Sequence, residues 1–448
     1  MTWVQTLNEW IWGPPLVIVL IAVGCLLTYR TRGVQFRYLY YAHKLAFTRH
    51  DDQAQGDISH FQALMTALAG TIGIGSIAGV ATGIVVGGYG ALFWMWVVGI
   101  IGMATKFSEA LLAIKYRVVD EAGEMCGGPM EYLERGAGKK SLAVLFAFFA
   151  VIAAFGTGNM VQANSVALAM QAISGVDPIW IGLILTVLVG FALFGGIKSI
   201  GSVASILVPS MAIMYILGGI ILLLINYSEI PHAFYLIFKY AFTPQAATGG
   251  FVGASVLLAI QMGASRSIFS SESGLGTSPI AAAAAKTDTP GRQALVSMSS
   301  AFITIIIVCT ITGLAIGVSG VLGEMGPDGN LLDGAALALR AFDKLFPGGG
   351  IFVTVALVAF AYSTILAWAY YGEKCIEYLF GIRAIKPFRV LYTLVVLPGA
   401  LLSLHFVWGM ANIMNGLMII PNLIGLLLLS KIVAKETKVF DLLHKKEL

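Results

Sequence analysis

The feature that most constrains this chain is a glycine-rich interruption, GTIGIGSIAG at 70–79, inside a long apolar segment. Each glycine weakens a helix by roughly 1 kcal/mol relative to alanine. In the hydrocarbon core of a membrane, backbone groups without hydrogen-bond partners are so costly that an unwound segment is tolerated only where it is buried in protein or lines a polar cavity. A second interruption, GASRSIFSSESGLGTSP at 263–279, follows in the second half of the chain. Paired interruptions of this kind are typical of the substrate and ion sites of secondary transporters.

The composition is that of a protein that crosses the membrane many times. Hydrophobic residues make up 58% and charged residues 11% of the 448 residues, whereas about 25% of residues in soluble domains are charged. The first apolar run has no small-x-small cleavage site and is followed by Arg30 and Arg32, so it is predicted to remain as a span. About eleven spans are predicted from runs long enough to cross a bilayer, at 13–29, 60–86, 89–115, 141–174, 178–197, 200–226, 249–285, 292–318, 350–379, 388–404 and 407–431.

Basic residues are distributed asymmetrically over the connections between these spans. If the N-terminus lies outside, nearly all arginines and lysines outside the spans fall on one side, including Lys139 and Lys140. Only Lys239, Arg340 and Lys344 fall on the other side. Because cytoplasmic loops carry the excess of basic residues, the sequence predicts an outer N-terminus and a cytoplasmic C-terminus in the plasma membrane.

The position of the two interruptions predicts an internal repeat. Ten spans follow the first one, and the interruptions fall in the first and sixth of these ten. Each half then has five spans, an odd number, so the halves cross the membrane in opposite directions. The predicted fold is an all-α polytopic membrane protein with an inverted five-plus-five repeat of the LeuT type after one extra N-terminal span. The predicted divisions are an N-terminal span with a basic linker (1–57), a first repeat (58–226), an outer loop (227–248), a second repeat (249–434) and a cytoplasmic tail (435–448).

Two other functional classes fit the sequence less well. A channel or facilitator without stoichiometric coupling is the alternative, but uncharged interrupted helices favour a binding site over a charged ring. An enzyme would need clustered acid, base or nucleophile residues. The ionisable residues expected within spans have no histidine or cysteine partner; they are Lys106, Glu109, Arg266 and Glu272. The net charge of +4 indicates no nucleic-acid partner, and the scattered cysteines and histidines predict no metal cofactor.

Three segments carry a resemblance to a known family. These are GLGTSPIAAAAAKTDTPGRQAL at 274–295, ALAGTIGIGSIAGVATGI at 67–84 and GGPMEYLERG at 127–136. They resemble the alanine or glycine:cation symporters, and the resemblance extends over essentially the whole chain. It implies sodium-coupled uptake of alanine and glycine through a LeuT-like fold of the amino acid–polyamine–organocation group, with sodium, the amino acid and membrane lipid as partners. One departure is the sequence Ser-Ser-Glu-Ser at 270–273, where a sequence closer to Asn-Glu-Ala is expected.

The first interruption is predicted to bind the carboxylate of an amino acid. A broken helix offers free backbone amides at the start of its second half, here those of Ile74, Gly75 and Ser76. Glycine lets a ligand approach the backbone without a Cβ in the way. The alternative is close helix packing through small residues, which is common in membranes.

The second interruption is predicted to bind the ammonium group. Carbonyl oxygens of Gln261, Met262 and Gly263 are the candidates, with Ser265 nearby. In the alternative, Gly274 and Gly276 mark the break.

The coupling ion is predicted to be sodium, which prefers hard oxygen ligands. Ser363 and Thr364 are the best side-chain candidates. By the resemblance, the remaining ligands are the carbonyl oxygens of Ala69, Ile72 and Phe360. The alternative is that both hydroxyl groups bond back to their own helix. Sodium is favoured over protons because no carboxylate or histidine is expected near these ligands.

Amide and aromatic side chains within spans complete the predicted pocket. Among the amides at 159–171, which are costly in a membrane unless paired, Asn164 is the first choice for the cavity and Gln171 the second; hydrogen bonding between helices is the alternative. Trp368, Phe269 and Phe155 are candidates for the pocket walls. Lys106 and Glu109 can pair locally, whereas Arg266 and Glu272 flank the second interruption and either latch the inner gate or form static ion pairs.

Overall fold

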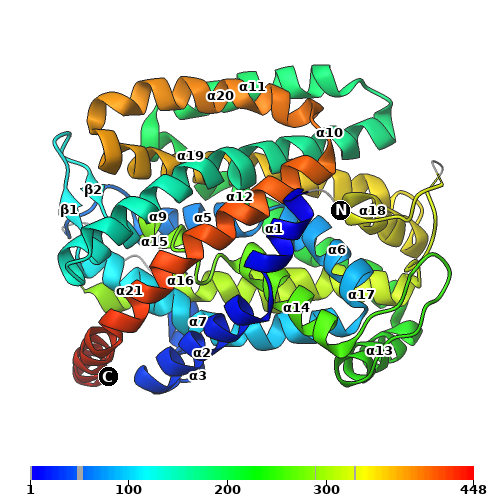
Figure 1. Cartoon of the computed structure of the whole chain (residues 1–448), viewed down its shortest axis with the longest axis horizontal. Coiled ribbons are helices and arrows are strands. Elements are labelled where there is room, and N and C mark those ends of the chain that lie inside the picture. The colour runs from blue at the N-terminus through cyan, green and yellow to red at the C-terminus, as the bar shows by residue number, and fades with distance from the viewer. Residues whose placement is uncertain (1–2, 48–53, 288, 327–328, 448) are drawn as a thin grey trace.

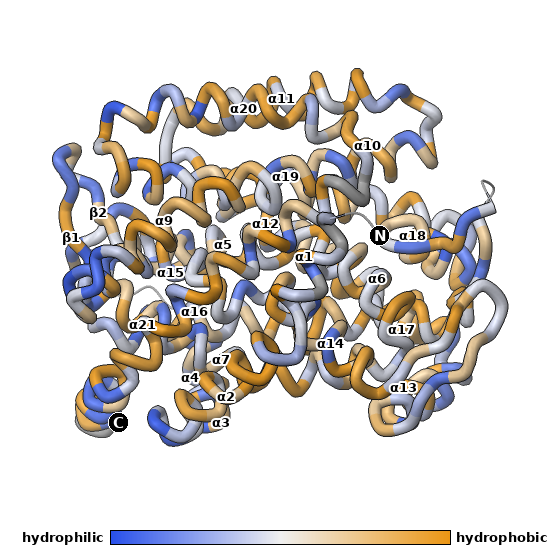
Figure 2. Tube along the Cα trace, viewed as in Figure 1, coloured by the Kyte–Doolittle hydropathy of each residue, from blue (hydrophilic) through white to orange (hydrophobic). Residues whose placement is uncertain are grey.

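The structure, a computed structural model, describes residues 3–47, 54–287, 289–326 and 329–447 and is almost entirely helical (Figure 1). Hydrophobic residues follow the long helices, and hydrophilic residues gather toward the two ends of the longest axis (Figure 2). Seven helices of the described chain are long and apolar enough to cross a membrane, and the apolar helices Pro14–Arg30, Ala78–Gly87 and Pro178–Leu193 are shorter. The chain is therefore a multi-pass membrane protein, as its composition predicts.

The N-terminal half contains both short and long helices and one small hairpin. Its elements are α1 (Trp3–Ile11), α2 (Pro14–Arg30), α3 (Val34–Arg37), α4 (Leu39–Phe47), α5 (His60–Thr71), η1 (Ile74–Ser76), α6 (Ala78–Gly87), α7 (Gly90–Lys115), β1 (Val118–Val119), β2 (Met125–Cys126), α8 (Pro129–Glu131), η2 (Tyr132–Gly136), α9 (Lys140–Ala153), η3 (Ala154–Met160), α10 (Val161–Ser174), α11 (Pro178–Leu193) and α12 (Gly196–Ile225). Strands β1 and β2 pair antiparallel, with Val118 opposite Cys126.

The C-terminal half repeats the pattern of an interrupted helix followed by long helices. Its elements are η4 (Tyr227–Glu229), α13 (Ile230–Phe242), α14 (Val256–Ser271), α15 (Ser278–Ala283), α16 (Pro290–Ala301), η5 (Phe302–Cys309), α17 (Thr310–Ser319), α18 (Gly334–Leu345), α19 (Gly349–Phe380), η6 (Ile382–Ala384), α20 (Ile385–Leu401) and α21 (Leu404–Glu447). The segments η3 and η5 are π-helical turns inside long helices, a feature often found at functional sites.

The connections between the long helices gather at opposite ends of the molecule. The β1–β2 hairpin and α15 lie at one end, whereas α13 and α18 lie at the other (Figure 1). The segment predicted as an outer loop at 227–248 is largely helical, since it contains η4 and α13. The predicted amphipathic helix is confirmed as α18, which buries Leu337 and Phe342. The predicted tail after 435 instead continues α21 to Glu447.

The first predicted break is confirmed. A capping box between Ser59 and Gln62 starts α5, which satisfies two backbone donors at the helix end. Helix α5 ends at Thr71, a single 3-10 turn follows at Ile74–Ser76, and α6 begins at Ala78. The interruption therefore falls inside the glycine-rich motif.

The second break lies inside the predicted segment but at its glycine-rich end. Helix α14 is continuous to Ser271, and α15 begins at Ser278. Glu272 ends α14 with a left-handed backbone, φ +57°, and Gly274 and Gly276 also have positive φ, which glycine adopts without a steric penalty. The prediction that the helix unwinds at Gln261–Gly263 is therefore wrong, and the alternative based on Gly274 and Gly276 is confirmed.

Candidate functional site

The first break is fully buried in the centre of the protein. Ile72, Ile74 and Ser76 have no exposed side-chain surface. The turn is closed by hydrogen bonds from Ser76 N to Gly73 O, 3.1 Å, and from Ile77 N to Ile74 O, 3.1 Å. This backbone is the only part of the α5–α6 segment that leaves the α-helical hydrogen-bonding pattern, as the predicted carboxylate site requires.

Side chains from three other helices surround this turn. Gln162 of α10 accepts a hydrogen bond from Ile74 N at 3.4 Å. A Cβ added to Gly75 would lie 2.7 Å from the Phe269 ring and 3.2 Å from Ser270 Oγ, both in α14. Since real Cβ atoms do not approach this closely, Gly75 is required by the packing of the last turn of α14 against the break. The contact also supports Phe269 as a wall of the site.

The predicted amides of α10 do not reach the break. Asn164 donates to Gly399 O at 3.2 Å and to Leu402 O at 2.7 Å, so it joins α10 to α20. Gln171 is exposed. Both predictions are corrected by the structure, which brings Gln162 to the site instead. Residues 162 and 164 are about 200° apart around a helix, so only one of them can face the break.

The residues predicted to bind the ammonium group lie inside α14. Their carbonyl oxygens belong to the regular helical ladder of Val256–Ser271. A Cβ on Gly263 would lie 2.5 Å from Trp94 Cβ and 2.6 Å from Ala91 O, so this glycine allows α14 to pack closely on α7. Met262 packs against Gly87 of α6. Gln261, Met262, Gly263 and Ser265 therefore lie away from either break, because the unwound segment starts only at Glu272.

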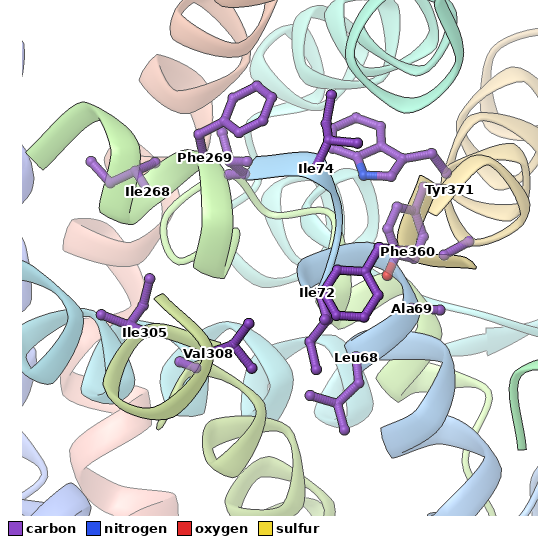
Figure 3. Close-up of a cluster of buried hydrophobic side chains, with 14 of the residues drawn as sticks. Leu68, Ala69, Ile72, Ile74, Ile268, Phe269, Ile305, Val308, Phe360 and Tyr371 are labelled. Carbon is purple, nitrogen blue, oxygen red and sulfur yellow. The ribbon is translucent and has the colours of Figure 1, made fainter. Parts of the chain in front are cut away.

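The five predicted sodium ligands lie together between α5 and α19. Thr364 Oγ1 donates to Ala69 O at 2.8 Å and to Phe360 O at 2.9 Å. Ser363 Oγ also donates to Phe360 O, at 2.9 Å. Ile72 is the residue at which α5 stops. Figure 3 shows Ala69, Ile72 and Phe360 gathered near the end of α5.

The close approach of the break to α19 depends on Gly73. A Cβ at this position would lie only 2.6 Å from Thr364 Oγ1. The hydroxyl groups do bond to their own helix, as the alternative requires, but Thr364 also reaches across to α5. The arrangement therefore brings hard oxygen atoms of two segments to one place, and sodium binding there stays a prediction.

Aromatic side chains of α19 close another side of the first break. Trp368 packs against Gly158, where a Cβ would lie 2.2 Å from Trp368 Cβ. It meets Tyr371 in a T-shaped contact with ring centroids 5.9 Å apart. A Cβ on Gly70 would lie 2.8 Å from Tyr371 Oη. Phe155, the third predicted wall residue, instead packs on Phe388 and Tyr392, away from the break.

The second break rests on polar groups from α7 and α21. Lys106 Nζ donates to Ser271 O at 2.5 Å. Asn422 Nδ2 donates to Glu109 Oε1 at 2.6 Å and to Gly274 O at 2.8 Å. Lys106 and Glu109 thus satisfy the unwound segment rather than pairing mainly with each other. The contribution of Asn422 was not predicted, because it comes from a helix remote in sequence.

A network at the hairpin end joins the ends of both interrupted helices. Arg117 Nη1 donates to Ala283 O at 3.0 Å and Ala285 O at 2.8 Å, both at the end of α15. Asp57 Oδ2, before α5, accepts from Met125 N of the hairpin at 2.7 Å. Backbone hydrogen bonds also connect 57–58 directly with 284–286. This end of the central pathway is therefore closed, and Arg266 and Glu272 take no part in the closure.

Lys374 fixes the same hairpin to α19. Its fully buried Nζ lies 2.9 Å from Asp120 Oδ2, 3.0 Å from Glu124 Oε2 and 3.0 Å from Glu377 Oε2. Burial raises the pKa of Asp120, but hydrogen bonds from Lys374 and from the Glu124 backbone outweigh it and hold the net pKa below its ordinary value. No short sequence motif announces this cluster, because its members are far apart in the chain.

A cavity of about 400 Å³ lies on the opposite side of the first break, toward α18. Its walls come from α6, α10, α14, α18 and α21 and include Ala78, Thr82, Ser165, Arg266, Asp333 and Trp408. Arg266 therefore faces this outer cavity, in contrast to the predicted latch at the inner gate. Its position follows from the late unwinding of α14, which leaves residue 266 in the outer half of the interrupted helix.

Comparison with known proteins agrees with this architecture. The model of the sodium:alanine symporter family matches residues 1–448. The sodium/alanine symporter AgcS of Methanococcus maripaludis is 53% identical, over 99% of this chain and 98% of its own, and an uncharacterized transporter of Haemophilus influenzae is 47% identical, over 97% and 94%. A solved Na⁺-coupled sialic acid symporter shares the fold, with a TM-score of 0.52 and 13% identity over 92% of this chain and 82% of that one. The chain belongs to the sodium:alanine symporter family.

Proposed function

We propose that this protein carries alanine and glycine into the cell together with sodium, with the substrate at the first helix break. As a member of its family, the chain is a sodium-coupled alanine symporter; the transport of glycine and the residues that do the work are our proposal. The observation that carries the proposal is the convergence of an unwound backbone at Ile74–Ser76 with the oxygen-rich contact between Thr364 and Ala69.

The substrate carboxylate is bound by the amides of Ile74, Gly75 and Ser76. A buried turn with exposed N–H groups attracts an anion because the positive end of α6 points toward it. Gln162 holds the Ile74 amide only through a long, 3.4 Å hydrogen bond, which a carboxylate can replace. The small pocket bounded by Phe269 and Trp368 favours small side chains.

The substrate ammonium group is bound by carbonyl oxygens at the end of α14. The last four carbonyls of a helix have no partner within the helix, and at this end Ile268 O is already used by Glu272 N, 2.8 Å. The carbonyls of Phe269 and Ser270 follow directly, in the turn that packs on Gly75. This proposal replaces the positions 261–263 and Ser265, which lie within the continuous helix.

Sodium is bound by the hydroxyl groups of Ser363 and Thr364 and the carbonyls of Ala69, Ile72 and Phe360. Sodium requires no titratable ligand, and this set consists of neutral hard oxygen atoms. Because Ile72 adjoins the turn that binds the carboxylate, the ion and the substrate hold the same short unwound segment. Each ligand therefore favours the conformation that the other needs, which is the requirement for coupling.

We also propose the inverted repeat and the orientation. The interrupted helices α5–α6 and α14–α15 begin two five-span units, 58–226 and 249–434, after the first of eleven spans, and 1–57, 227–248 and 435–448 are the connecting and terminal parts. The end of α12 at Ile225 supports the first boundary. The N-terminus lies toward α18 and the C-terminus toward the hairpin (Figure 1), which supports an outer N-terminus and a cytoplasmic C-terminus in the plasma membrane.

Alternating access then follows from movement of the interrupted helices against the remaining bundle. The hairpin network closes the cytoplasmic side, and the cavity beside α18 is the outer approach to the substrate. Opening inward requires the contacts of Arg117 with the end of α15 to break.

The test is uptake of radiolabelled alanine and glycine by proteoliposomes with an imposed sodium, potassium or proton gradient. Only inward sodium should drive accumulation. One charge moving through 100 mV contributes about 2.3 kcal/mol, equivalent to roughly a forty-fold substrate gradient. Flux that never exceeds equilibrium, does not saturate and shows no counterflow would instead indicate a channel.

A further inference from the structure

The outer cavity contains a buried cation with unused hydrogen-bond donors. Arg266 is 8% exposed, and its Nε and Nη1 atoms are buried without a hydrogen-bond partner. Within the described ranges, no carboxylate lies within ion-pair distance of its guanidinium group. Its one close polar contact is with the face of Trp408, 5.4 Å from the ring centroid. A buried guanidinium left in this state is costly, so the site favours an anionic ligand.

A carboxylate lies on another wall of the same cavity. Asp333 precedes α18, and its Oδ1 caps that helix by accepting from Gly334 N at 2.5 Å. Its negative charge interacts with Arg266 across the cavity. The two groups thus face one space of about 400 Å³ without touching. A ligand with an anionic and a cationic group can bridge them.

We propose that this outer cavity is a second binding position for the transported amino acid. Arg266 holds the carboxylate through charge-assisted hydrogen bonds, and Asp333 holds the ammonium group. The inference rests on the proposed function, because it takes the same class of zwitterion as the ligand. A planar guanidinium presents paired donors that match a carboxylate.

A stack of side chains separates this position from the first break. Arg266 lies over Trp408, and the Trp408 and Phe269 rings stack with centroids 5.1 Å apart. Phe269 in turn contacts Gly75 at the break. A zwitterion that binds Arg266 is therefore held directly above the aromatic pair that it must displace. The outer position captures the substrate before it moves inward.

The experiment separates the two positions by filling the inner one. Gly75→Leu places a large side chain against Phe269 in the space that we assign to the inner substrate. Ala172→Cys adds a thiol to the cavity wall in a Cys25→Ser background, because Cys25 is exposed and the other three cysteines are buried. The reaction rate of this thiol with a methanethiosulfonate reagent is then measured at increasing alanine concentrations, in the purified full-length protein.

Alanine should slow the reaction in the Gly75→Leu protein. Adding Arg266→Gln or Asp333→Asn should raise the concentration for half-protection about tenfold or more. Matched controls, Arg340→Gln and Asp343→Asn on α18, should leave it unchanged, because Arg340 pairs with Glu324 and Asp343 binds Gly348 N instead. Alaninamide and propionate, each lacking one charge, should protect poorly.

Protection by alanine only when Gly75 is intact would overturn the outer position while leaving the inner site in place. Protection that is insensitive to Arg266→Gln would also overturn it. Failure of the proposed function has a different signature: a protein with Gly75 intact would show neither protection by alanine nor sodium-driven uptake. A second readout, the KM for uptake, should rise about tenfold in Arg266→Gln with Gly75 intact.

Discussion

Replacing Thr364 with valine tests the sodium site most directly. Valine has the same shape as threonine but lacks the hydroxyl group that reaches Ala69 O at 2.8 Å. Losing a polar contact with a charged partner costs about 1.5–3 kcal/mol. The sodium-free protein also loses a neutral hydrogen bond worth about 1 kcal/mol, and this loss partly cancels the first. The difference, about 0.5–2 kcal/mol, corresponds to a roughly 2- to 30-fold weaker sodium affinity.

The assay is alanine uptake into proteoliposomes as a function of sodium concentration. The half-saturating sodium concentration should rise by this factor, and the apparent alanine affinity at low sodium should fall with it, because coupling is reciprocal. At saturating sodium, transport should approach that of the parent protein. Thr364→Ser keeps the oxygen atom and should restore most of the sodium affinity.

Thr354→Val is the matched control for this prediction. Thr354 is a buried threonine of the same helix, and its hydroxyl donates only to Gly350 O of that helix, at 3.0 Å. This variant should keep the parental sodium dependence. If Thr364→Val and Thr354→Val have the same sodium dependence as the parent, the ion is bound elsewhere. A change confined to the alanine KM at saturating sodium would equally contradict the assignment.

Three further predictions concern the break and the hairpin. Gly75→Leu should abolish sodium-dependent alanine uptake, measured in proteoliposomes at parental protein levels, and an active variant would show that the carboxylate lies elsewhere. Lys374→Met strands three carboxylates and should lower the free energy of unfolding by about 3–5 kcal/mol, against less than about 1 kcal/mol for the exposed control Lys344→Met; equal denaturation midpoints would refute this. The lowered pKa of Asp120 means that its stabilising contribution is complete above its unfolded pKa of about 3.9 and is lost as the pH falls through the lower folded value. Thermal unfolding from pH 7 to 3 should therefore show a loss that Asp120→Asn makes smaller.

Local sequence was sufficient where a property depends on the chain's own composition. The density of apolar residues determines that the protein lies in a membrane. Glycines at 70, 73 and 75 weaken one helix so strongly that the break at 72–77 was predictable within a few residues. The pair Ser363–Thr364 was predictable as an ion site only with the family resemblance, because hydroxyl groups in helices commonly bond to their own backbone.

Tertiary structure decided the second break and the faces of the helices. Unwinding at 272–277 is stabilised by Lys106 and Asn422, which come from α7 and α21 and satisfy the freed carbonyls. Nothing in the local sequence reports where those distant donors lie. Similarly, Gln162 rather than Asn164 meets the first break, because the rotation of α10 is set by its packing against α19 and α20.

The sequence alone therefore determined the solvent of this protein, its class and one of its two helix breaks, since these follow from the free energy of each segment in lipid. Only the folded structure decided which carbonyls remain free, which amide reaches them and which charges face the outer cavity. The physical reason is that unwinding a helix in a membrane is stable only where partners from other helices replace the lost hydrogen bonds, and those partners are brought together by packing.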